Sequence, residues 1–366
     1  MEQVLSEELA GIGLDKIRTG RAGVHFEADW AGVQKANLYS RLATRILVQV
    51  AQGPVNSEAD IAKLSLATPW ESWFGPDHTL RVDTSAINSP MKSLQYCNLV
   101  VKDGICDRLR DREGARPSID TVRPDARVHL FLSESVATLY LDTSGESLFK
   151  RGWRLDKGQA PIRENLAAGL LALSGWKPGT TLLDPFCGSA TILIEAAWIA
   201  LDIAPGINRP FAFERLRHHD ADQWQALRQE ATNRIKTSTD ATITGFEASE
   251  ETLEMARRNL LRANIPAGVV NLVHADACRE PCSSKPGLIL TNPPYGIRIE
   301  AEQELMSRWA SHLKQAYVGW QVGVISADLD LPSTMRLKAR RRTPVFNGAL
   351  DCRLFMFDLV SGSYQA

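Results

Sequence analysis

The feature that most constrains the fold is an apolar run that two prolines end abruptly. Residues 288–291 (Leu-Ile-Leu-Thr) have the length and composition of a buried parallel strand. Pro293 and Pro294 stop that strand, because proline has no backbone N–H to donate to a sheet. Open α/β sheets bind their ligands at the carboxyl ends of their strands. We therefore expect residues 292–296 (Asn-Pro-Pro-Tyr-Gly) to form a rigid loop at a ligand-binding edge.

The chemistry of this loop suits a flat base that carries an exocyclic amine. Asn292 offers an amide oxygen, Pro293 a backbone carbonyl with a fixed direction, and Tyr295 a flat ring. The two oxygens can accept the two amine hydrogens while the ring stacks on the base. The pattern thus favours Asn292, Pro293 and Tyr295 as catalytic residues. The alternative is a proline-rich turn without a catalytic role.

A second loop follows another apolar strand, which we expect at residues 181–184. Residues 182–191 read Leu-Leu-Asp-Pro-Phe-Cys-Gly-Ser-Ala-Thr, an acid followed by a tight turn and a helix start. This order is typical of a strand–loop–helix nucleotide site, in which Gly188 lets the backbone approach the ligand. The patterns Gly-x-Gly-x-x-Gly and Walker A are both absent from the sequence, which argues against NAD and ATP. The alternative for Asp184 alone is an acid that caps a loop.

Two further acids stand at the ends of predicted strands. Glu247 ends one strand, and Asp276 follows the next one along the chain. The separation of Glu247 from Asp184 exceeds the usual roughly 20 residues because a long excursion, 204–240, intervenes. Either acid alone could be an ordinary surface residue. Their places at successive strand ends favour ligand binding.

Strand and helix patterns divide the chain into two kinds of fold. Residues 1–150 mix helices with antiparallel strands, an α+β pattern that includes a hairpin at 127–132 and 136–141. From residue 160 strands alternate with helices, which predicts an α/β fold with a mostly parallel sheet and an antiparallel edge. The strands expected there are residues 181–184, 241–247, 269–273, 288–291, 320–325, 342–346 and 350–359.

These motifs resemble those of class I methyltransferases that use S-adenosylmethionine (SAM) and carry an Asn-Pro-Pro-Tyr signature. The whole chain resembles the bacterial 23S rRNA guanine-N2 methyltransferases. The resemblance implies a ferredoxin-like segment at 1–35, a THUMP RNA-binding domain at 36–150 and a Rossmann-like, seven-stranded methyltransferase domain at 151–366. The matching stretches are residues 23–26, 40–45, 141–145, 151–154, 160–168, 184–191, 204–206 and 292–296.

The resemblance also implies how SAM would be held. Asp184 would bind the cationic amino group, Glu247 the ribose hydroxyls and Asp276 the adenine amino group. The amides at the start of the following helix would favour the SAM carboxylate. The predicted cofactor-binding residues are Pro161, Asp184, Pro185, Cys187, Gly188, Ser189, Ala190, Glu247, Ala248, Asp276, Ala277 and Asn292.

Three features depart from the family pattern. Ala190 stands where the family often has glycine, which would tighten the SAM loop. The chain starts in a helix where the family starts in a strand, which raises the question of whether the ferredoxin-like segment is complete. Some relatives carry a second methyltransferase domain, for which the chain has no room.

The implied reaction is direct transfer of the SAM methyl group to the N2 amine of a guanosine in 23S rRNA. The base would have to be unpaired or flipped out to reach the loop. The RNA would be deproteinised or an assembly intermediate. Alignment by Asn292 and the Pro293 carbonyl is expected to suffice, so we assign no catalytic histidine and no covalent role to Cys187.

Other functions stay open at this point. The same chemistry would serve N2-methylation of a tRNA guanosine, or N6-methylation of adenine. A non-catalytic RNA-binding or ribosome-assembly factor is a further alternative, which the intact acids and the 292–296 loop disfavour. Sulfur transfer is disfavoured because the ATP loop and paired cysteines are missing.

Two basic stretches could contact RNA. Residues 148–154 (Leu-Phe-Lys-Arg-Gly-Trp-Arg) read either as a linker with solvated charges or as a hinge that contacts RNA, with Trp153 available to stack. Residues 336–342 hold five basic residues in seven and read either as a solvated hairpin edge or as a phosphate contact beside the pocket.

Composition narrows the class of protein. A formal net charge of −1 restricts any RNA surface to a local patch. The six cysteines include no Cys-x-x-Cys pair and no accompanying histidine cluster, so we expect no disulfide framework and no metal site. There is no secretory signal and no apolar run long enough to span a membrane. These features predict a cytoplasmic protein.

Overall fold

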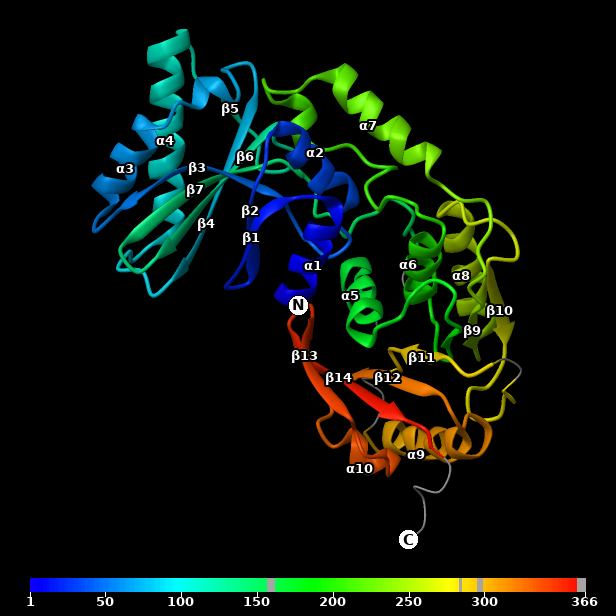
Figure 1. The fold of residues 1–366 in the computed structure, drawn as a ribbon. Helices are drawn as coiled ribbons and strands as arrows, with labels where there is room; N and C mark the ends of the chain where they lie inside the picture. The colour runs from blue at the N-terminus through cyan, green and yellow to red at the C-terminus, as the bar shows by residue number, and fades with distance from the viewer. Residues whose placement is uncertain (157–161, 283–284, 295–298, 361–366) are drawn as a thin grey trace. The chain divides into compact units, whose positions relative to one another are not determined.

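The computed structural model divides the chain into two compact units, which are described separately (Figure 1). The larger unit comprises Met1–Phe26, Phe149–Asn208 and Glu230–Ala366, and the smaller unit comprises Glu27–Leu148 and Arg209–Gln229. The structure describes residues 1–156, 162–282, 285–294 and 299–360. Within these ranges, no helix has both the length and the apolar character needed to cross a membrane.

A seven-stranded sheet organises the larger unit, in the order β10-β9-β8-β11-β12-β14-β13. The first five strands in this order are parallel to their neighbours, and β14 runs antiparallel to both β12 and β13. The predicted α/β class, with a parallel sheet and an antiparallel edge, is thereby confirmed. The strands are β8 (Leu182–Asp184), β9 (Ile243–Glu247), β10 (Val270–His274), β11 (Leu288–Thr291), β12 (Gln321–Ser326), β13 (Arg341–Asn347) and β14 (Leu350–Asp358).

The strand order of this sheet reverses between β8 and β11. The chain runs outward from β8 through β9 to β10, and then returns to place β11 on the other side of β8. Such a reversal opens a crevice at the carboxyl ends of the two central strands, where α/β proteins bind their ligands. Both predicted loops, after Asp184 and after Thr291, leave the sheet at this crevice.

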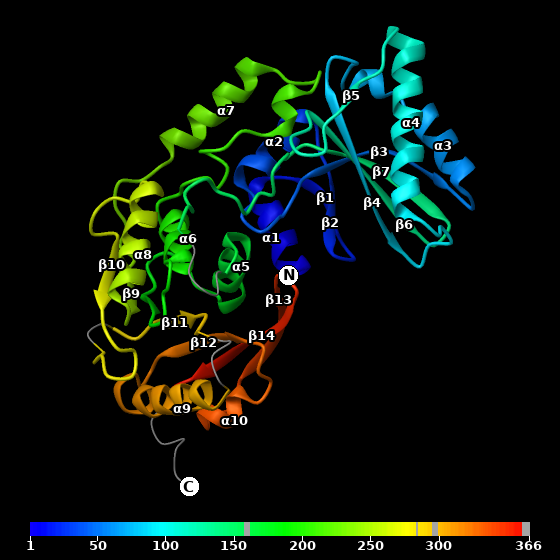
Figure 2. The ribbon, with the colours of Figure 1, turned by 180° about the vertical axis from the view of Figure 1, so that it is seen from behind.

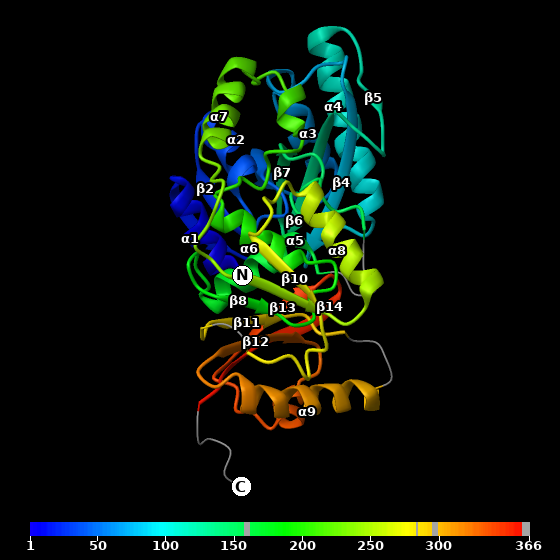
Figure 3. The ribbon, with the colours of Figure 1, turned by 90° about the vertical axis from the view of Figure 1, so that its right-hand side faces the viewer.

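Helices cover both faces of the sheet, as Figures 1 and 3 show. Every residue of β8 and β11 is buried, which explains why these strands are apolar runs without alternation. On one face, Trp309 and Leu313 of α9 pack against Val322 and Phe355. The helices are α5 (Glu164–Ser174), α6 (Thr191–Ala200) and α8 (Glu250–Arg262) on one face, and α9 (Ile299–Ala316) and α10 (Leu331–Met335) on the other.

The N-terminal residues of the chain belong to the larger unit. Helix α1 (Glu2–Ile12) contacts α5, and a two-stranded sheet of β1 (Asp15–Gly20) and β2 (Gly23–Glu27) follows it. Gly13 ends α1 in the left-handed conformation, which glycine adopts without a Cβ clash.

The smaller unit contains a five-stranded sheet with α3 and α4 on one face (Figure 2). The predicted hairpin is present as β6 and β7, and the α+β class is confirmed. The expectation of antiparallel strands holds for β3, β6 and β7 but is wrong for β4, which runs parallel to β6. The long helix α4 crosses between these two strands and returns the chain to the same edge, which makes parallel pairing possible. The elements are α2 (Trp30–Tyr39), β3 (Leu47–Pro54), α3 (Glu58–Ala67), β4 (Thr79–Ile87), α4 (Leu94–Glu113), β5 (Ser118–Ile119), β6 (Ala126–Ser133) and β7 (Val136–Asp142).

Part of the excursion predicted at 204–240 packs within the smaller unit. Arg209 donates hydrogen bonds to the carbonyls of Ser144, Glu146 and Ser147. Phe213 packs edge-on against Trp224 of α7 (Ala221–Asn233), with ring centroids 4.9 Å apart. A stretch whose hydrogen bonds are satisfied in this way is folded structure and not a disordered insertion.

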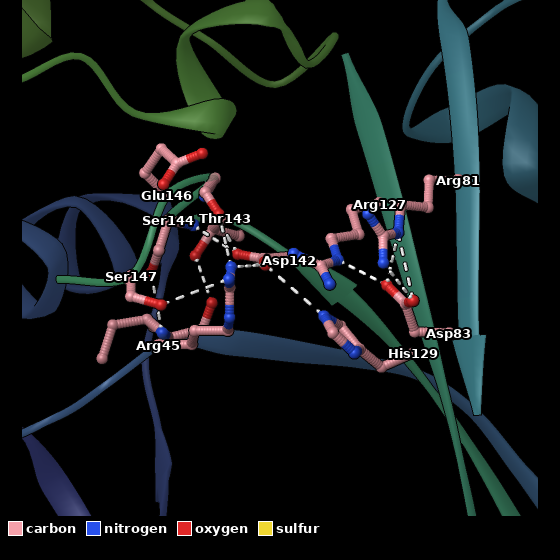
Figure 4. A network of polar contacts seen from close by, with 12 residues as sticks. Arg45, Arg81, Asp83, Arg127, His129, Asp142, Thr143, Ser144, Glu146 and Ser147 are labelled. Atoms are coloured by element: carbon pink, nitrogen blue, oxygen red, sulfur yellow. Dashed lines mark hydrogen bonds and ion pairs between the residues drawn. The ribbon is translucent and has the colours of Figure 1, made fainter. Parts of the chain in front are cut away.

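A buried carboxylate, Asp142, lies at the end of β7 in the smaller unit (Figure 4). It accepts hydrogen bonds from the backbone N–H groups of Ser144 and Gly145, at 2.8 and 3.0 Å, and forms an ion pair with Arg45. Burial raises the pKa of Asp142, but the hydrogen bond with His129 and the charge of Arg45 outweigh it, so the net pKa is lowered.

We predict that Asp142→Asn destabilises the smaller unit by about 2 kcal/mol at pH 7, because it leaves Arg45 without its counter-charge. Because the pKa of Asp142 is lowered in the folded protein, its carboxylate stabilises the fold at pH values above the unfolded-state pKa of about 4. This stabilisation is lost as the pH falls through the folded-state pKa. The difference between wild type and variant should therefore narrow below about pH 4. Thermal unfolding of wild type and variant at pH 7 and below about pH 4 measures this difference in stability.

Asp83→Asn is the matched control for this prediction. Asp83 pairs with Arg81 and Arg127 on the same sheet, but it is more exposed than Asp142 (Figure 4). Loss of the Asp83 carboxylate should lower the free energy of unfolding by less than about 1 kcal/mol. Equal effects of the two substitutions would show that burial of Asp142 does not matter.

Candidate cofactor and substrate site

A single hydrogen bond joins the two predicted loops. The hydroxyl of Thr291, at the end of β11, donates to Oδ1 of Asp184, at the end of β8, over 2.6 Å. The backbone N–H of Phe186 donates to the same oxygen over 3.3 Å. The neighbouring strands bring these side chains together because Leu183 and Ile289 are register partners. The predicted cofactor loop and the 292–296 loop thus start side by side.

Asp184 is a buried carboxyl group whose surroundings disfavour its charged form. It is only 2 % exposed, and burial raises its pKa to about 7, further than the hydrogen bonds from Thr291 and Phe186 lower it. Its contacts in the described part of the chain are a hydroxyl and a backbone amide, with no cation among them. A buried acid of this kind gains most from a ligand that brings a positive charge.

Glu247 ties the end of β9 to the loop after β8. One of its oxygens accepts the N–H of Gly188 at 3.1 Å, and the other accepts the N–H of Ser249 at 3.0 Å. The N–H of Cys187 donates to the carbonyl of Phe246 at 3.0 Å. Each carboxylate oxygen can accept more than one hydrogen bond, so Glu247 can bind a diol while it holds the loop.

Ala190 marks the start of α6 with a strained backbone. Its φ of 65° is in the left-handed region, which costs a residue with a Cβ roughly 1–2 kcal/mol. Glycine would adopt this conformation without that cost, and the turn at Ala190 places the first residue of α6 at Thr191. Ser189 and Ala190 are both buried beneath the loop.

The third acid stands at the end of the neighbouring strand. Asp276 comes two residues after β10, and its Oδ1 accepts the N–H of Cys278 at 2.9 Å. Ala277 beside it is buried in the core, whereas Ala248 is exposed after β9. Because β8, β9 and β10 are parallel neighbours, Asp184, Glu247 and Asp276 lie at the same edge of the sheet.

The second loop borders a separate hollow. Asn292 is half-buried and Pro293 is buried, and Pro293 lines a pocket of about 380 Å³. The pocket lies beside the end of β12 and is walled by residues of α9 and α10. Pro185 is buried after β8. The remaining two predicted site residues, Pro161 and Tyr295, lie outside the described residues.

Comparison with protein-family models matches three successive parts of the chain. Residues 151–355 match the RMKL-like methyltransferase domain, residues 55–142 the THUMP domain, and residues 1–47 the RlmL ferredoxin-like domain. The chain belongs to the RMKL-like methyltransferase family. The resemblance inferred from the sequence is therefore confirmed.

Curated relatives of this family extend over the whole chain. The ribosomal RNA large subunit methyltransferase K/L of Shewanella sp. (strain MR-4) is 36% identical over 369 residues, which cover 98% of this chain and 51% of the relative. The protein of the same name from Photobacterium profundum is 36% identical over 374 residues, or 100% and 52% of the two chains. The chain spans about half the length of the curated relatives it matches.

Solved structures show the same architecture. SMU.472, crystallised with SAH, has a TM-score of 0.89 at 28% identity and covers 98% of this chain and 95% of its own. A chain from Listeria monocytogenes str. 4b F2365, named as a predicted N6-adenine-specific DNA methylase, has a TM-score of 0.88 at 28% identity, covering 97% and 93%. TrmN from Thermus thermophilus, at 20% identity and a TM-score of 0.72 over 98% and 96% of the chains, shares the fold.

The structure of this RMKL-like chain corrects the expectations for Arg151 and Trp153 in residues 148–154. Trp153 is 2 % exposed and Arg151 is 1 % exposed, with Nε of Arg151 3.2 Å from Glu195. Arg151 therefore carries no solvated charge, and Trp153 is not available for base stacking, whereas Lys150 is exposed. Acidic partners far along the chain make burial of these charges possible, and the local sequence does not show them.

Arg154 instead supports the cofactor loop. Its guanidinium donates to Glu164 at 2.9 Å, and to the carbonyl of Ile162 and the hydroxyl of Thr191, both at 2.7 Å. It thereby fixes the first residue of α6 against α5. We did not predict this role from the sequence, although Arg154 belongs to residues 151–154, one of the stretches that match the family.

We also did not predict a role for Asn259 from the sequence. It is fully buried on α8, and its amide donates to the carbonyls of Ser189 and Asp156 at 3.2 and 3.3 Å. Hydrogen bonds from Arg258 and Arg262 lower the pKa of Asp156 to about 2. A polar residue on the buried face of an amphipathic helix was the available signal, since such a residue needs a hydrogen-bond partner.

The cysteines have no catalytic assignment, and none of the basic residues of 336–342 lines the pocket beside Pro293. All six cysteines are free, and burial raises the pKa of Cys187, so its thiol stays protonated. Among the residues that the structure describes, no group of His, Cys, Asp and Glu side chains could hold a metal ion. The five basic residues of 336–342 are all exposed. Arg340 pairs with Asp358 at 3.3 Å, and Arg342 lies over the ring of Phe355.

We predict that Asp184→Asn stabilises the ligand-free protein at pH 8. The folded protein keeps a proton on Asp184 that the unfolded chain releases above about pH 4, so stability falls as the pH rises from about 4 to 7, by up to about 4 kcal/mol. The amide removes this loss and retains an oxygen for Thr291. Chemical unfolding of the two proteins at pH 8 and pH 5 checks the expected convergence at the lower pH.

Asp330→Asn serves as the control, because Asp330 is exposed. It should leave the pH dependence of wild type unchanged. A variant at Asp184 that is less stable than wild type at pH 8 would contradict the assignment of Asp184 as a buried acid that lacks a counter-charge.

Proposed function

We propose that this chain transfers a methyl group from SAM to the exocyclic N2 of a guanosine in 23S rRNA, giving N2-methylguanosine. The observation that carries the proposal is the hydrogen bond between Thr291 and Asp184, which sets a cofactor loop and an amine-binding loop side by side. The curated relatives support the RNA substrate by name, and the SAH complex of SMU.472 supports the cofactor.

The chemistry of the residues fits SAM. The cationic amino group of its methionine supplies the counter-charge that buried Asp184 lacks, and this contact would lower the pKa of Asp184. The backbone amides at the start of α6 suit the carboxylate. Glu247 accepts the ribose hydroxyls, and Asp276 accepts the adenine amino group. The other cofactor-binding residues of the proposal are Pro161, Pro185, Cys187, Gly188, Ser189, Ala190, Ala248, Ala277 and Asn292.

The catalytic residues act by alignment. Bound SAM supplies a methyl group activated by its sulfonium charge. Asn292 and the Pro293 carbonyl accept the amine hydrogens, which aims the nitrogen lone pair and stabilises positive charge growing on it. Alignment of this kind contributes up to roughly 7–11 kcal/mol in ideal cases. Tyr295 stacks on the base. The methylated amine loses its proton to water, so no general base is required.

The RNA partner follows from the front half of the chain. We assign residues 1–35 to a ferredoxin-like segment, 36–150 to a THUMP domain that binds RNA, and 151–366 to the methyltransferase domain. The match of 55–142 to the THUMP model supports RNA binding. Such a protein would act in the cytoplasm.

We predict that Asn292→Ala lowers methyl transfer by at least about 100-fold, as loss of one transition-state hydrogen bond does elsewhere. SAH binding should stay within a few-fold of wild type, since most cofactor contacts are on other strands. Single-turnover assays with nucleoside mass spectrometry measure transfer, and calorimetry measures SAH binding. Asn292→Asp keeps an acceptor oxygen and should retain part of the rate. Wild-type turnover in Asn292→Ala would remove Asn292 from the mechanism.

We predict that Arg336→Glu with Lys338→Glu weakens RNA binding and flattens its salt dependence. Each lost phosphate contact should reduce the slope of log K against log salt by about 0.7 for a single strand. SAH binding should not change. Lys177→Glu is the control, because Lys177 is an exposed cation that lies outside the 336–342 run. An equal effect of Lys177→Glu would rule out a specific role for the 336–342 run.

A further inference from the structure

Two acids line the pocket beside Pro293, Glu302 on α9 and Asp328 after β12, and the proposed transfer uses neither of them. The pocket measures about 380 Å³, which is within the range of small-molecule sites, and Asp328 lines it together with Ser326. Both residues stand at the carboxyl end of β12. The remaining walls are mostly apolar, with Met306, Val324 and Leu331 among them, and suit the faces of a flat base.

The hydrogen bonds of Asp328 leave it able to accept one more. Its Oδ1 accepts the N–H of Asp330 at 2.9 Å, and its own N–H donates to Oγ of Ser326 at 3.0 Å. Within the described part of the chain, Oδ2 has no partner, and the Ser326 hydroxyl keeps its proton for a further acceptor. The pocket therefore presents an anionic acceptor beside a hydroxyl donor.

The sheet sets this pair next to the amine-binding loop. Strands β11 and β12 are parallel neighbours, with Thr291 and Val324 as the last register partners. Asn292 and Pro293 follow β11 immediately after this pair, while Ser326 ends β12 and Asp328 comes two residues later. Parallel neighbours lie about 4.8 Å apart, which is the scale of one edge of a purine.

We propose that Asp328 is the residue that selects guanine, by accepting the ring N1–H while Asn292 and Pro293 hold the N2 amine. The Ser326 hydroxyl donates to O6 on the same edge. Guanine presents its donors and acceptor in this order, so a carboxylate next to the amine site matches it. The inference rests on the proposed function and adds the basis of its base specificity.

The same acid rejects the other bases that carry an exocyclic amine. In adenine and cytosine the ring nitrogen next to the amine carries a lone pair and no hydrogen. A carboxylate placed there meets a second acceptor and loses a hydrogen bond, which a polar site penalises strongly. Asp328 therefore separates guanine-N2 methylation from the adenine-N6 chemistry named for the Listeria relative.

The test compares two RNA fragments that differ at one base. One carries guanosine at the methylated position and the other carries 2,6-diaminopurine, which keeps the N2 amine but has a lone pair at N1. Wild type should prefer guanosine by about 10–100-fold in kcat/KM, the discrimination typical of one base-reading contact. Asp328→Asn can turn an amide N–H toward the unprotonated N1, so its preference should fall to unity or reverse.

Two further variants keep the test decisive. Asp328→Ala should bring the ratio close to one without reversal, and exposed Asp330→Asn should keep the wild-type ratio. SAH binding by each variant shows that it is folded. A wild-type ratio near one, or a ratio that Asp328→Asn and Asp328→Ala leave unchanged, overturns the role of Asp328 alone. Failure of wild type to form N2-methylguanosine overturns the proposed function, and the role of Asp328 falls with it.

Discussion

The site depends on one buried carboxylate and on the hydroxyl that holds it. Asp184 is taken out of water at the end of β8, and Thr291 at the end of β11 donates to it over 2.6 Å. That contact spans the reversal in strand order, so it connects two loops 107 residues apart in the sequence. The burial that raises the pKa of Asp184 to about 7 costs the empty protein stability. A cationic ligand bound to Asp184 would restore this lost stability, so cofactor binding is expected to raise the stability of the protein.

Other residues fix the loops around this acid without taking part in the reaction. Arg154 fastens the start of α6, Asn259 holds the carbonyl of Ser189, and Glu247 holds the amide of Gly188. Each uses a side chain to satisfy loop backbone or hydroxyl groups that would otherwise be without partners. Sites that must hold two substrates in line need such support, because small displacements are expensive in rate.

The sequence was sufficient for features that depend on short stretches. The apolar runs at 181–184 and 288–291 predicted β8 and β11, and the acids at strand ends predicted the edge at which Asp184, Glu247 and Asp276 lie. Residues 148–154 could not be understood in this way, because Glu195 and Glu164 neutralise their charges from far along the chain. The parallel pairing of β4 with β6 escaped prediction for the same reason, since it depends on where α4 returns the chain. The pocket with Asp328 is formed by residues of α9, β12, α10 and β14 together with Pro293, and no local sequence pattern shows it.

Methylation of the N2 of a guanosine in large-subunit rRNA is the activity on which the other proposals rest. The most direct measurement is transfer from labelled SAM to separate pools of deproteinised large-subunit rRNA, tRNA and DNA, followed by nucleoside mass spectrometry. We predict N2-methylguanosine from the rRNA pool alone. N2-methylguanosine from tRNA alone would retain the chemistry and overturn the substrate. N6-methyladenine from any pool, or SAM binding without any product, would contradict the proposed activity.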